Sequence, residues 1–284
     1  MASSKQFKWQ KILYKRQPFP DNYSGGDEQF LSELKKNLSA VKYTYWEAVF
    51  GVARLVFHLN LIVLLYIIFE YVFANVLTAD VLAIALISTS VVLYVVYAFV
   101  MTNASVDFLD HLYTVVVLLI FGYATTPAIR TLTDTISTDT IFALSFITAL
   151  ISCVFHDYGI NAPIVSYQLS VSSGLSSAVF LLSRLNSNDV AFVMLSMAFA
   201  LHAFTPIIRN LLFAQYTIIS SILTLSLSIC STYFLWTLYV ELAVIWALFQ
   251  IFLLFVCPYV LIVKQKSKQT LHGPWDEAIL RKQN

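Results

Sequence analysis

Charge is the scarcest feature of this chain. Only 12% of its 284 residues are Asp, Glu, Lys or Arg, whereas hydrophobic residues make up 59%. A soluble globular domain typically carries about 25% charged residues, which cover its water-facing surface. This composition therefore argues against a soluble globular protein, and we expect lipid to surround most of the chain.

Cysteine is also scarce. The three cysteines, Cys153, Cys230 and Cys257, each lie in an apolar run and are far apart in the sequence. Disulfide frameworks and structural zinc sites both need sets of cysteines, or of cysteines and histidines, at characteristic spacings. We therefore expect no disulfide framework and no metal site.

Motifs of several enzyme classes are missing. The sequence has no glycine-rich phosphate loop, no His-Glu-x-x-His, no Gly-x-Ser-x-Gly and no Asp-x-Asp pair. Its polar tails are too short to fold into a nucleotide-binding domain. If the chain serves an enzyme, we expect the site of the donor substrate on another chain, so we assign no catalytic residue and no cofactor.

Long apolar segments dominate what is present. A membrane-spanning helix needs about 20 apolar residues, and eight segments approach this length. They lie near residues 48–73, 81–102, 111–129, 138–155, 163–183, 190–208, 213–235 and 240–263. The sequence therefore predicts an all-α fold, a polytopic transmembrane bundle of about eight spans over residues 48–263. Residues 1–47 form an N-terminal segment and residues 264–284 a C-terminal tail.

Basic residues are concentrated on one side of this predicted bundle. Of the 17 Lys and Arg residues, all but two lie on the same side of the bundle as the tails. They are in the tails themselves, or in a connection between spans or next to one. Arg209 is expected in one such connection, and the two exceptions are Arg130 and Arg184. Because basic loops are retained in the cytosol, we expect both termini to be cytosolic.

The N-terminal segment carries two local signals. Pro18 and Pro20 predict an extended or turned stretch over Gln17–Tyr23, since proline fixes φ and lacks a backbone donor. Between about Asp27 and Lys42, apolar residues recur at helical spacing. We expect a short amphipathic helix there, lying on the membrane surface or packed on another cytosolic chain.

Two groups of polar residues on the predicted cytosolic side are candidates for function, because ionisable groups at membrane depth are costly. Arg54 and His58 share a helix face and suit an anionic lipid phosphate, although such residues also snorkel or pair between helices. His156, Asp157 and Tyr158 open a polar connection. They suit acid/base chemistry, lipid or partner binding, or a structural turn.

A hydroxyl-rich hairpin, Arg130–Thr140, lies on the opposite side. Ser137 is a good N-cap, and Asp139 in the first turn suits the helix dipole. The hairpin is either a contact for a lipid head group or a partner, or a capped turn with an Arg130–Asp134 pair.

A short internal sequence repeat favours a different function. Thr126–Leu132 resembles Thr205–Leu211, and the two copies end spans that run in opposite directions. Inverted repeats are typical of transporters, so a lipid or small-solute transporter is the alternative interpretation.

Motifs spread along the chain resemble the PIG-C family. Trp9–Tyr14 and Gln17–Tyr23 resemble its N-terminal signature, and His272–Ala278 resembles its C-terminal motif. Shorter matches are Ser137–Ile141, Asp157–Gly159 and Ser183–Leu185, so the resemblance runs from end to end in order.

The resemblance implies a multi-spanning subunit of the endoplasmic-reticulum complex that begins glycosylphosphatidylinositol (GPI) anchor synthesis. That complex transfers N-acetylglucosamine from UDP-GlcNAc to phosphatidylinositol on the cytosolic face. A separate glycosyltransferase subunit performs the catalysis, which makes this chain a non-catalytic subunit. The implied partners are that catalytic subunit, further membrane subunits, phosphatidylinositol and membrane lipid, with no nucleic acid.

Two sets of residues follow as hypotheses for these roles. Rigid proline- and tryptophan-bearing segments make good docking elements, because little ordering entropy remains to be lost. The partner-docking set is Trp9, Gln17, Pro18, Phe19, Pro20, Asp21, Asn22, Tyr23, His272, Gly273, Pro274, Trp275 and Asp276. The lipid-headgroup set is Arg54, His58, Asp139, His156, Asp157 and Tyr158.

Overall fold

The structure is a computed structural model that describes residues 16–20, 23, 35–36, 44–100, 108–131, 133, 135–158, 165–265 and 271–272. It separates into two units. One is Tyr45–Tyr259, and the other combines residues 1–44 with residues 260–284. Each unit is considered by itself below.

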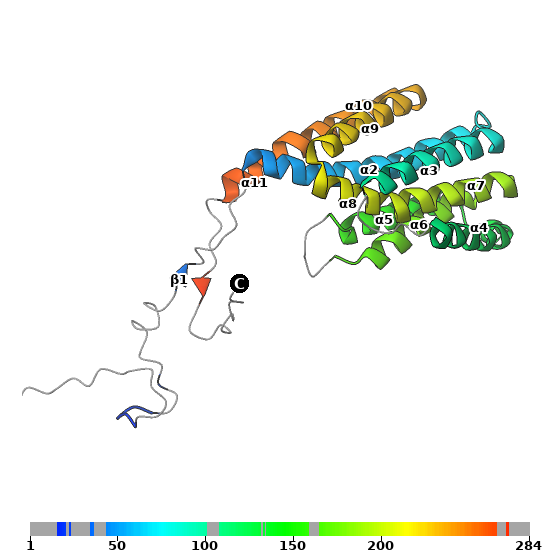
Figure 1. Cartoon of the computed structure of the whole chain (residues 1–284). Helices are drawn as coiled ribbons and strands as arrows, with labels where there is room; N and C mark the ends of the chain where they lie inside the picture. Colours follow the sequence, from blue (N-terminus) through cyan, green and yellow to red (C-terminus); the bar gives the residue numbers. More distant parts are fainter. Residues whose placement is uncertain are drawn as a thin grey trace, which may run out of the picture. The chain divides into compact units, whose positions relative to one another are not determined.

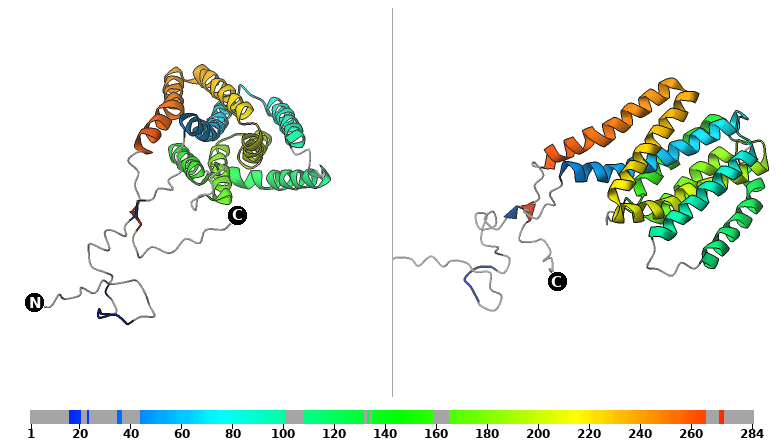
Figure 2. Two further views of the ribbon diagram at one scale, coloured as in Figure 1. Left: turned by 60° about the vertical axis from the view of Figure 1, so that its left-hand side comes forward. Right: turned by 45° about the horizontal axis from the view of Figure 1, so that its top comes forward.

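The Tyr45–Tyr259 unit is a bundle of helices that run back and forth through short connections (Figures 1 and 2). Within the described ranges, eight helical segments make up the bundle, the last of which continues to Gln265. They are α2 Tyr45–Phe73, α3 Ala79–Val100, α4 Phe108–Thr131, α5 Thr138–Phe155, α6 Tyr167–Leu182, α7–η1–α8 Asn188–Gln215, α9 Thr217–Leu238 and α10–η2–α11 Val240–Gln265.

Seven of these segments are long and apolar enough to cross a membrane. The exception is α6, which has 16 residues. It begins at Tyr167 behind the N-cap Ser166, later than the expected start at residue 163, while Pro163 lies outside the described residues. The prediction of a polytopic helical bundle is confirmed.

Serines pack α6 closely against α5. Ser145 Oγ lies 2.9 Å from both the Ser177 carbonyl oxygen and the Ser177 hydroxyl. Nearer the other end, Ser152 Oγ donates to the Ser170 carbonyl oxygen at 2.8 Å. Small hydroxyl-bearing residues let helix backbones approach and bond across the interface, which is a common means of helix association in lipid.

Two helices contain a π-helical turn just before a proline. η1, Ala200–Phe204, is followed two residues later by Pro206, and η2, Phe252–Val256, is followed two residues later by Pro258. Proline lacks the N–H that an α-helix needs and its ring crowds the carbonyl four residues earlier. A widened turn relieves this conflict, so each helix continues through its proline.

This continuity corrects one expectation from the sequence. Arg209 was predicted in a connection between spans near residues 190–208 and 213–235. It lies instead inside α8, Thr205–Gln215, and is only 1% exposed. The prediction was wrong because Pro206 and the charged Arg209 together look like the end of a span, whereas η1 accommodates the proline and neighbouring helices surround the arginine.

Contacts between helix ends show an alternating, up-and-down arrangement. At one end of the unit, Tyr45 at the start of α2 donates to the Phe255 carbonyl of η2 at 3.3 Å. At the other end, Tyr71 near the end of α2 is hydrogen-bonded to Thr237 near the end of α9. Short connections between neighbouring spans produce this arrangement.

A buried polar network joins α2 to the hairpin of α9 and α10. Asn60, which is fully buried, donates to Ser228 Oγ at 3.0 Å and to Gln250 Oε1 at 3.5 Å. The side-chain oxygen of Asn60, Oδ1, accepts from Ser231 Oγ at 2.5 Å and from Gln250 Nε2 at 3.3 Å. Every polar group of the Asn60 side chain is therefore paired inside the bundle, as an apolar solvent demands.

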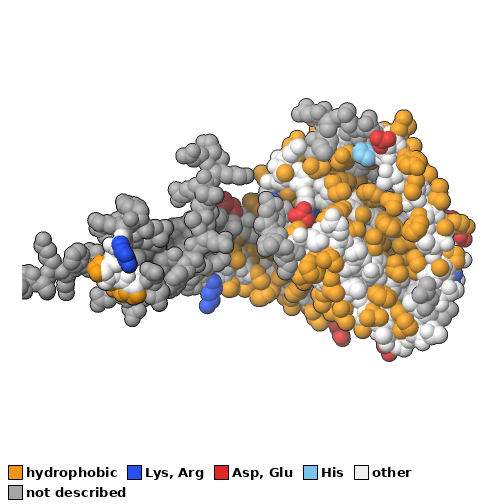
Figure 3. All heavy atoms as spheres, turned by 90° about the horizontal axis from the view of Figure 1, so that it is seen from below, with side chains coloured by type: hydrophobic (Ala, Val, Ile, Leu, Met, Phe, Trp, Pro, Cys, Tyr) orange, Lys and Arg blue, Asp and Glu red, His pale blue; other side chains and the backbone are white. Residues whose placement is uncertain are grey.

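The outer surface of the bundle is apolar. Large hydrophobic side chains on α3, α4, α9 and α10 are exposed, among them Ile84, Phe99, Ile120, Ile222 and Ile245. Figure 3 shows hydrophobic side chains covering most of the described surface on one face. An exposed apolar surface of this extent is costly in water and is what a lipid environment stabilises.

The terminal unit contains a two-stranded antiparallel pairing. β1, Lys35–Lys36, pairs with β2, Leu271–His272, with Lys35 opposite His272. The prediction of an amphipathic helix between Asp27 and Lys42 was therefore wrong at Lys35–Lys36, and its other residues lie outside the described ranges. An isolated helix of this length is marginal in water, whereas strand pairing satisfies the same backbone groups.

The proline-rich stretch takes the non-helical form predicted for it. Tyr23 donates its backbone N–H to the Pro20 carbonyl at 2.9 Å, which closes a turn. The Phe19 and Tyr23 rings stack with centroids 4.6 Å apart. The described part of Gln17–Tyr23 is thus turned and extended, as expected.

Replacing Asn60 with leucine should destabilise the bundle. The change removes the amide that pairs with Ser231 and Gln250, and it leaves their polar groups buried without partners. We expect a loss of roughly 1–3 kcal/mol in the free energy of unfolding. Chemical denaturation of the purified protein in detergent measures it.

The matched control is Gln215→Leu, which removes an exposed amide at the end of α8. Its stability should remain close to that of the wild type. Equal losses in the two variants would contradict a structural role for the Asn60 network.

Candidate functional site

Arg209 is the centre of the most polar cluster inside the bundle. Its Nη1 donates to Nε2 of His156 at 2.8 Å, and its Nη2 donates to the Asp157 carbonyl oxygen at 2.5 Å. Nη2 and Nε also reach Oδ1 of the neighbouring Asn210, at 2.8 and 3.3 Å. The guanidinium thus holds the residues that follow α5 against α8.

These bonds fix the form of His156. Because Nε2 accepts from Arg209, this nitrogen carries no proton, and Nδ1 is the donor to Ser170 Oγ at 2.8 Å. Ser170 Oγ in turn lies 3.0 Å from the Ser152 carbonyl oxygen, to which it donates. Burial, with Arg209 and His202 adding to it, lowers the pKa of His156 from 6.5 to about 3. His156 is therefore neutral at physiological pH.

Two further histidines pack beside it. The His58 ring stacks on His156 with centroids 3.6 Å apart, and His202 meets His58 edge-on at 6.0 Å. Gly174 makes room for this packing, because a Cβ at that position would lie 2.7 Å from Nδ1 of His202. His202 belongs to η1, so the π turn and the glycine together admit a third ring.

Arg54 lies at the edge of the cluster and is only partly buried. Its Nη1 donates to the Tyr158 carbonyl oxygen at 2.6 Å, and its guanidinium lies 5.0 Å from the centroid of the Phe213 ring. Its Nε is buried and has no hydrogen-bond partner. Arg54 is thus a cation held in place from two sides with donor capacity remaining.

The chemistry of this arrangement favours binding over catalysis. His58 and His156 are each 1% exposed, so neither can reach a substrate proton as a general acid or base must. Across the described ranges, no three His, Cys, Asp or Glu residues are arranged to hold a metal ion. What remains accessible is the cationic edge at Arg54, next to the Asp157 carboxylate that accepts from Asn210 at 3.2 Å.

The comparison with known proteins now bears on this geometry. The family model described as phosphatidylinositol N-acetylglucosaminyltransferase matches residues 9–276. The C subunit of human phosphatidylinositol N-acetylglucosaminyltransferase is 34% identical over 287 residues, covering 99% of this chain and 96% of the human protein. The chain belongs to the PIG-C family of phosphatidylinositol N-acetylglucosaminyltransferase subunits.

Two further members show the breadth of this family. A putative C subunit of the same enzyme from Dictyostelium discoideum is 35% identical, over 95% of this chain and 79% of its own length. The subunit named GPI2 of Schizosaccharomyces pombe is 25% identical, over 95% and 86%. No solved structure was found to match this chain. The resemblance to the PIG-C family predicted from the sequence motifs is confirmed.

The structure brings together five of the six residues predicted to meet a lipid head group. Arg54, His58, His156, Asp157 and Tyr158 form the cluster around Arg209. Asp139 is exposed in the first turn of α5. Because His156 directly follows this 18-residue helix, Asp139 lies about 27 Å from the cluster. A head-group role for Asp139 therefore belongs to a different end of the bundle.

Only part of the predicted docking set is described. Gln17, Pro18, Phe19, Pro20 and Tyr23 lie in the turned stretch of the terminal unit, and His272 pairs opposite Lys35. The other members lie outside the described residues: Trp9, Asp21, Asn22, Gly273, Pro274, Trp275 and Asp276.

Sequence reasoning missed the residues that organise the cluster. Arg209, Asn210, His202 and Gly174 were not proposed for the site. A weak signal was available, since His202, Pro206 and Arg209 are closely spaced in an apolar segment. Their convergence with His156 depends on η1, which the spacing alone does not predict.

Acidification should destabilise the fold through His156. The pKa of His156 is about 3 in the folded protein and 6.5 when unperturbed. The unfolded chain therefore binds a proton below 6.5 that the folded chain does not, and stability is lost as the pH falls from 6.5 toward 3. Thermal midpoints of the purified protein, measured at neutral and at mildly acidic pH, should show this decrease.

His156→Asn keeps a donor and an acceptor but does not titrate, so it should show a smaller decrease with pH. The control His111→Asn removes an exposed histidine of α4 and should follow the wild type. The same decrease in His156→Asn as in the wild type would show that His156 does not carry the effect.

Proposed function

We propose that this chain is the membrane subunit of the complex that transfers N-acetylglucosamine from UDP-GlcNAc to phosphatidylinositol, the first step of GPI-anchor synthesis. The observation that carries the proposal is the match, over nearly the whole chain, to relatives named as C subunits of phosphatidylinositol N-acetylglucosaminyltransferase. Its site of action is the endoplasmic-reticulum membrane, with both termini in the cytosol. The transporter alternative is not favoured by these relatives.

The role within that complex is scaffolding and placement of the lipid substrate. The bundle offers buried, neutral histidines rather than an accessible acid or base, and its outer surface is apolar. A donor-sugar site therefore belongs to a separate catalytic subunit. Support for the scaffold comes from the turned Gln17–Tyr23 stretch, with its Phe19–Tyr23 stack, and from the pairing of β1 with β2.

Lipid placement centres on Arg54. A phosphodiester is an anion with several acceptor oxygens, and a guanidinium presents a fork of donors that fits it. Arg54 is only partly buried and is fixed by the Tyr158 carbonyl and the Phe213 ring. The neighbouring Asp157 carboxylate suits hydroxyl groups of the inositol ring. Arg209 acts behind this edge, as the residue that holds Asp157 in position.

The internal sequence repeat does not support a transporter. Pro206 follows a π turn in one copy, whereas Pro127 lies inside the uninterrupted α-helix α4 in the other. Arg209 is buried among helices, while Arg130 bonds to the connection between α6 and α7. The two copies therefore differ in local structure as well as in environment.

Two variants separate the two proposed roles. Replacing Gln17–Tyr23 with a Gly/Ser linker should release the catalytic subunit when the complex is purified in mild detergent. Arg54→Gln should leave the complex intact but raise KM for phosphatidylinositol about ten-fold or more, since it removes a hydrogen bond to a charged group. Co-purification and N-acetylglucosamine transfer by the purified complex measure both effects.

The control replaces residues 281–284 with Gly/Ser and should behave like the wild type. Full activity and intact co-purification of the linker variant would reject the docking role. An unchanged KM for phosphatidylinositol in Arg54→Gln would reject lipid placement by Arg54, without bearing on the scaffold.

A further inference from the structure

A second cationic site lies at the opposite end of the bundle. Arg130 and Arg184, the two basic residues that the sequence placed opposite the tails, are 54 positions apart in a chain where charge is rare. Both line the same pocket of about 360 Å³. Its other lining residues are Pro127, Thr131, Ser183, Leu185, Asn186 and Asn188.

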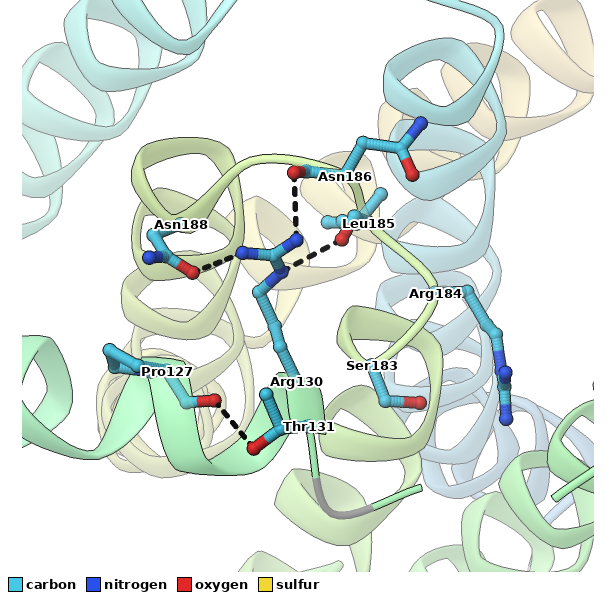
Figure 4. A pocket seen from close by; sticks show the side chains of 8 residues that line it. All are labelled: Pro127, Arg130, Thr131, Ser183, Arg184, Leu185, Asn186 and Asn188. Atoms are coloured by element: carbon cyan, nitrogen blue, oxygen red, sulfur yellow. Dashed lines mark hydrogen bonds between the residues drawn. The ribbon is translucent and has the colours of Figure 1, made fainter. Parts of the chain in front are cut away.

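The pocket is built around the Arg130 guanidinium, as Figure 4 shows. Nε donates to the Leu185 carbonyl oxygen at 2.8 Å and Nη2 to the Asn186 carbonyl oxygen at 2.7 Å. Nη1 is hydrogen-bonded to Oδ1 of Asn188. These bonds orient the cation but use only neutral acceptors, so its charge is not compensated by them.

Arg184 is a second cation whose hydrogen bonds go to neutral acceptors. Its Nη2 donates to the Thr133 and Ile136 carbonyl oxygens at 2.9 and 2.8 Å. Its Nε is buried with no hydrogen-bond partner. None of the eight residues that line the pocket among the described parts of the chain is acidic. Figure 4 shows the Arg184 side chain pointing away from the Arg130 guanidinium, so Arg130 is the cation at the centre of the pocket and Arg184 adds positive charge from its wall. An uncompensated guanidinium in a polar pocket creates a site that favours an anion.

A pocket of mixed lining adjoins this one. It measures about 280 Å³ and shares Leu185 and Asn186 with the cationic pocket. Its apolar wall includes Val72, Phe73 and Val190, at the end of α2 and the start of α7, and its polar lining includes Asn75 and Thr78. A cationic pocket beside a partly apolar one, at the end of membrane-spanning helices, suits an amphiphile with an anionic head.

We propose that the Arg130–Arg184 pocket binds a phosphate group, as carried by the head of an anionic phospholipid or by free phosphate. The site is separate from the Arg54 edge, because α5 places the two at opposite ends of the bundle, about 27 Å apart. It therefore stands independently of the function proposed above. The bound phosphate would compensate the charge of Arg130 and join the end of α4 to the α6–α7 connection.

Hydrogen exchange of the full-length protein tests the site locally. The protein is placed in nanodiscs of phosphatidylcholine alone and in nanodiscs that also contain phosphatidylinositol. The amides of residues 183–188 should exchange about ten-fold more slowly with the anionic lipid, if it is present at about ten times its Kd. Arg130→Gln combined with Arg184→Gln should abolish the slowing, whereas Arg54→Gln should retain it at residues 183–188.

Two further measurements identify the source of the phosphate and control for variants that fail to fold. Inorganic phosphate added to phosphatidylcholine nanodiscs would reproduce the slowing if the site takes the free ion, and would leave it unchanged if the site takes lipid. Arg130→Lys with Arg184→Lys keeps the charge and the fold, and should show weaker but measurable slowing, since lysine cannot bond as a fork.

Two outcomes would overturn the proposal. One is exchange at residues 183–188 that responds neither to phosphatidylinositol nor to phosphate in a folded wild-type protein. The other is slowing that appears only in Asp134→Asn, which would show that the carboxylate of Asp134 neutralises the arginines in the native chain.

Discussion

The cost of burying polar groups without partners shapes this structure, and Arg209, a fully buried guanidinium, is the residue on which it bears most heavily. A guanidinium away from water is costly unless its donors are used. Arg209 meets the requirement with His156, the Asp157 carbonyl and Asn210. Because these partners come from α8 and from the residues after α5, satisfying one side chain also fixes how those two elements meet.

The same requirement separates the polar residues that hold the bundle together from the polar residues at its edge. The histidine rings and the α5–α6 serines are enclosed and packed against one another, so they specify the packing. Arg54 differs, because its side chain is only partly buried at the edge of the cluster. A bundle that encloses its histidines and leaves a cation at the rim is suited to holding an anionic lipid beside a catalytic partner.

Much of the architecture could be predicted because apolar length is a strong signal. The eight helical segments and the grouping of Arg54, His58 and His156–Tyr158 follow from spans whose ends must alternate between two sides. The place of Arg209 could not be predicted, since a proline followed by an arginine usually marks the end of a span. The packing of His202, which η1 carries into the cluster, depends on space provided by Gly174, and the β1–β2 pairing depends on segments more than 200 residues apart. Such features arise from tertiary contacts and leave no local pattern.

A double-mutant cycle between Arg209 and His156 tests the central claim most directly. The free energies of unfolding of Arg209→Gln, His156→Asn and the double variant are compared with that of the wild type in detergent. If the Arg209–His156 bond organises the cluster, the two losses should be coupled by roughly 1–3 kcal/mol. Losses that add to within about 0.5 kcal/mol would show that the two residues act independently and would contradict the account.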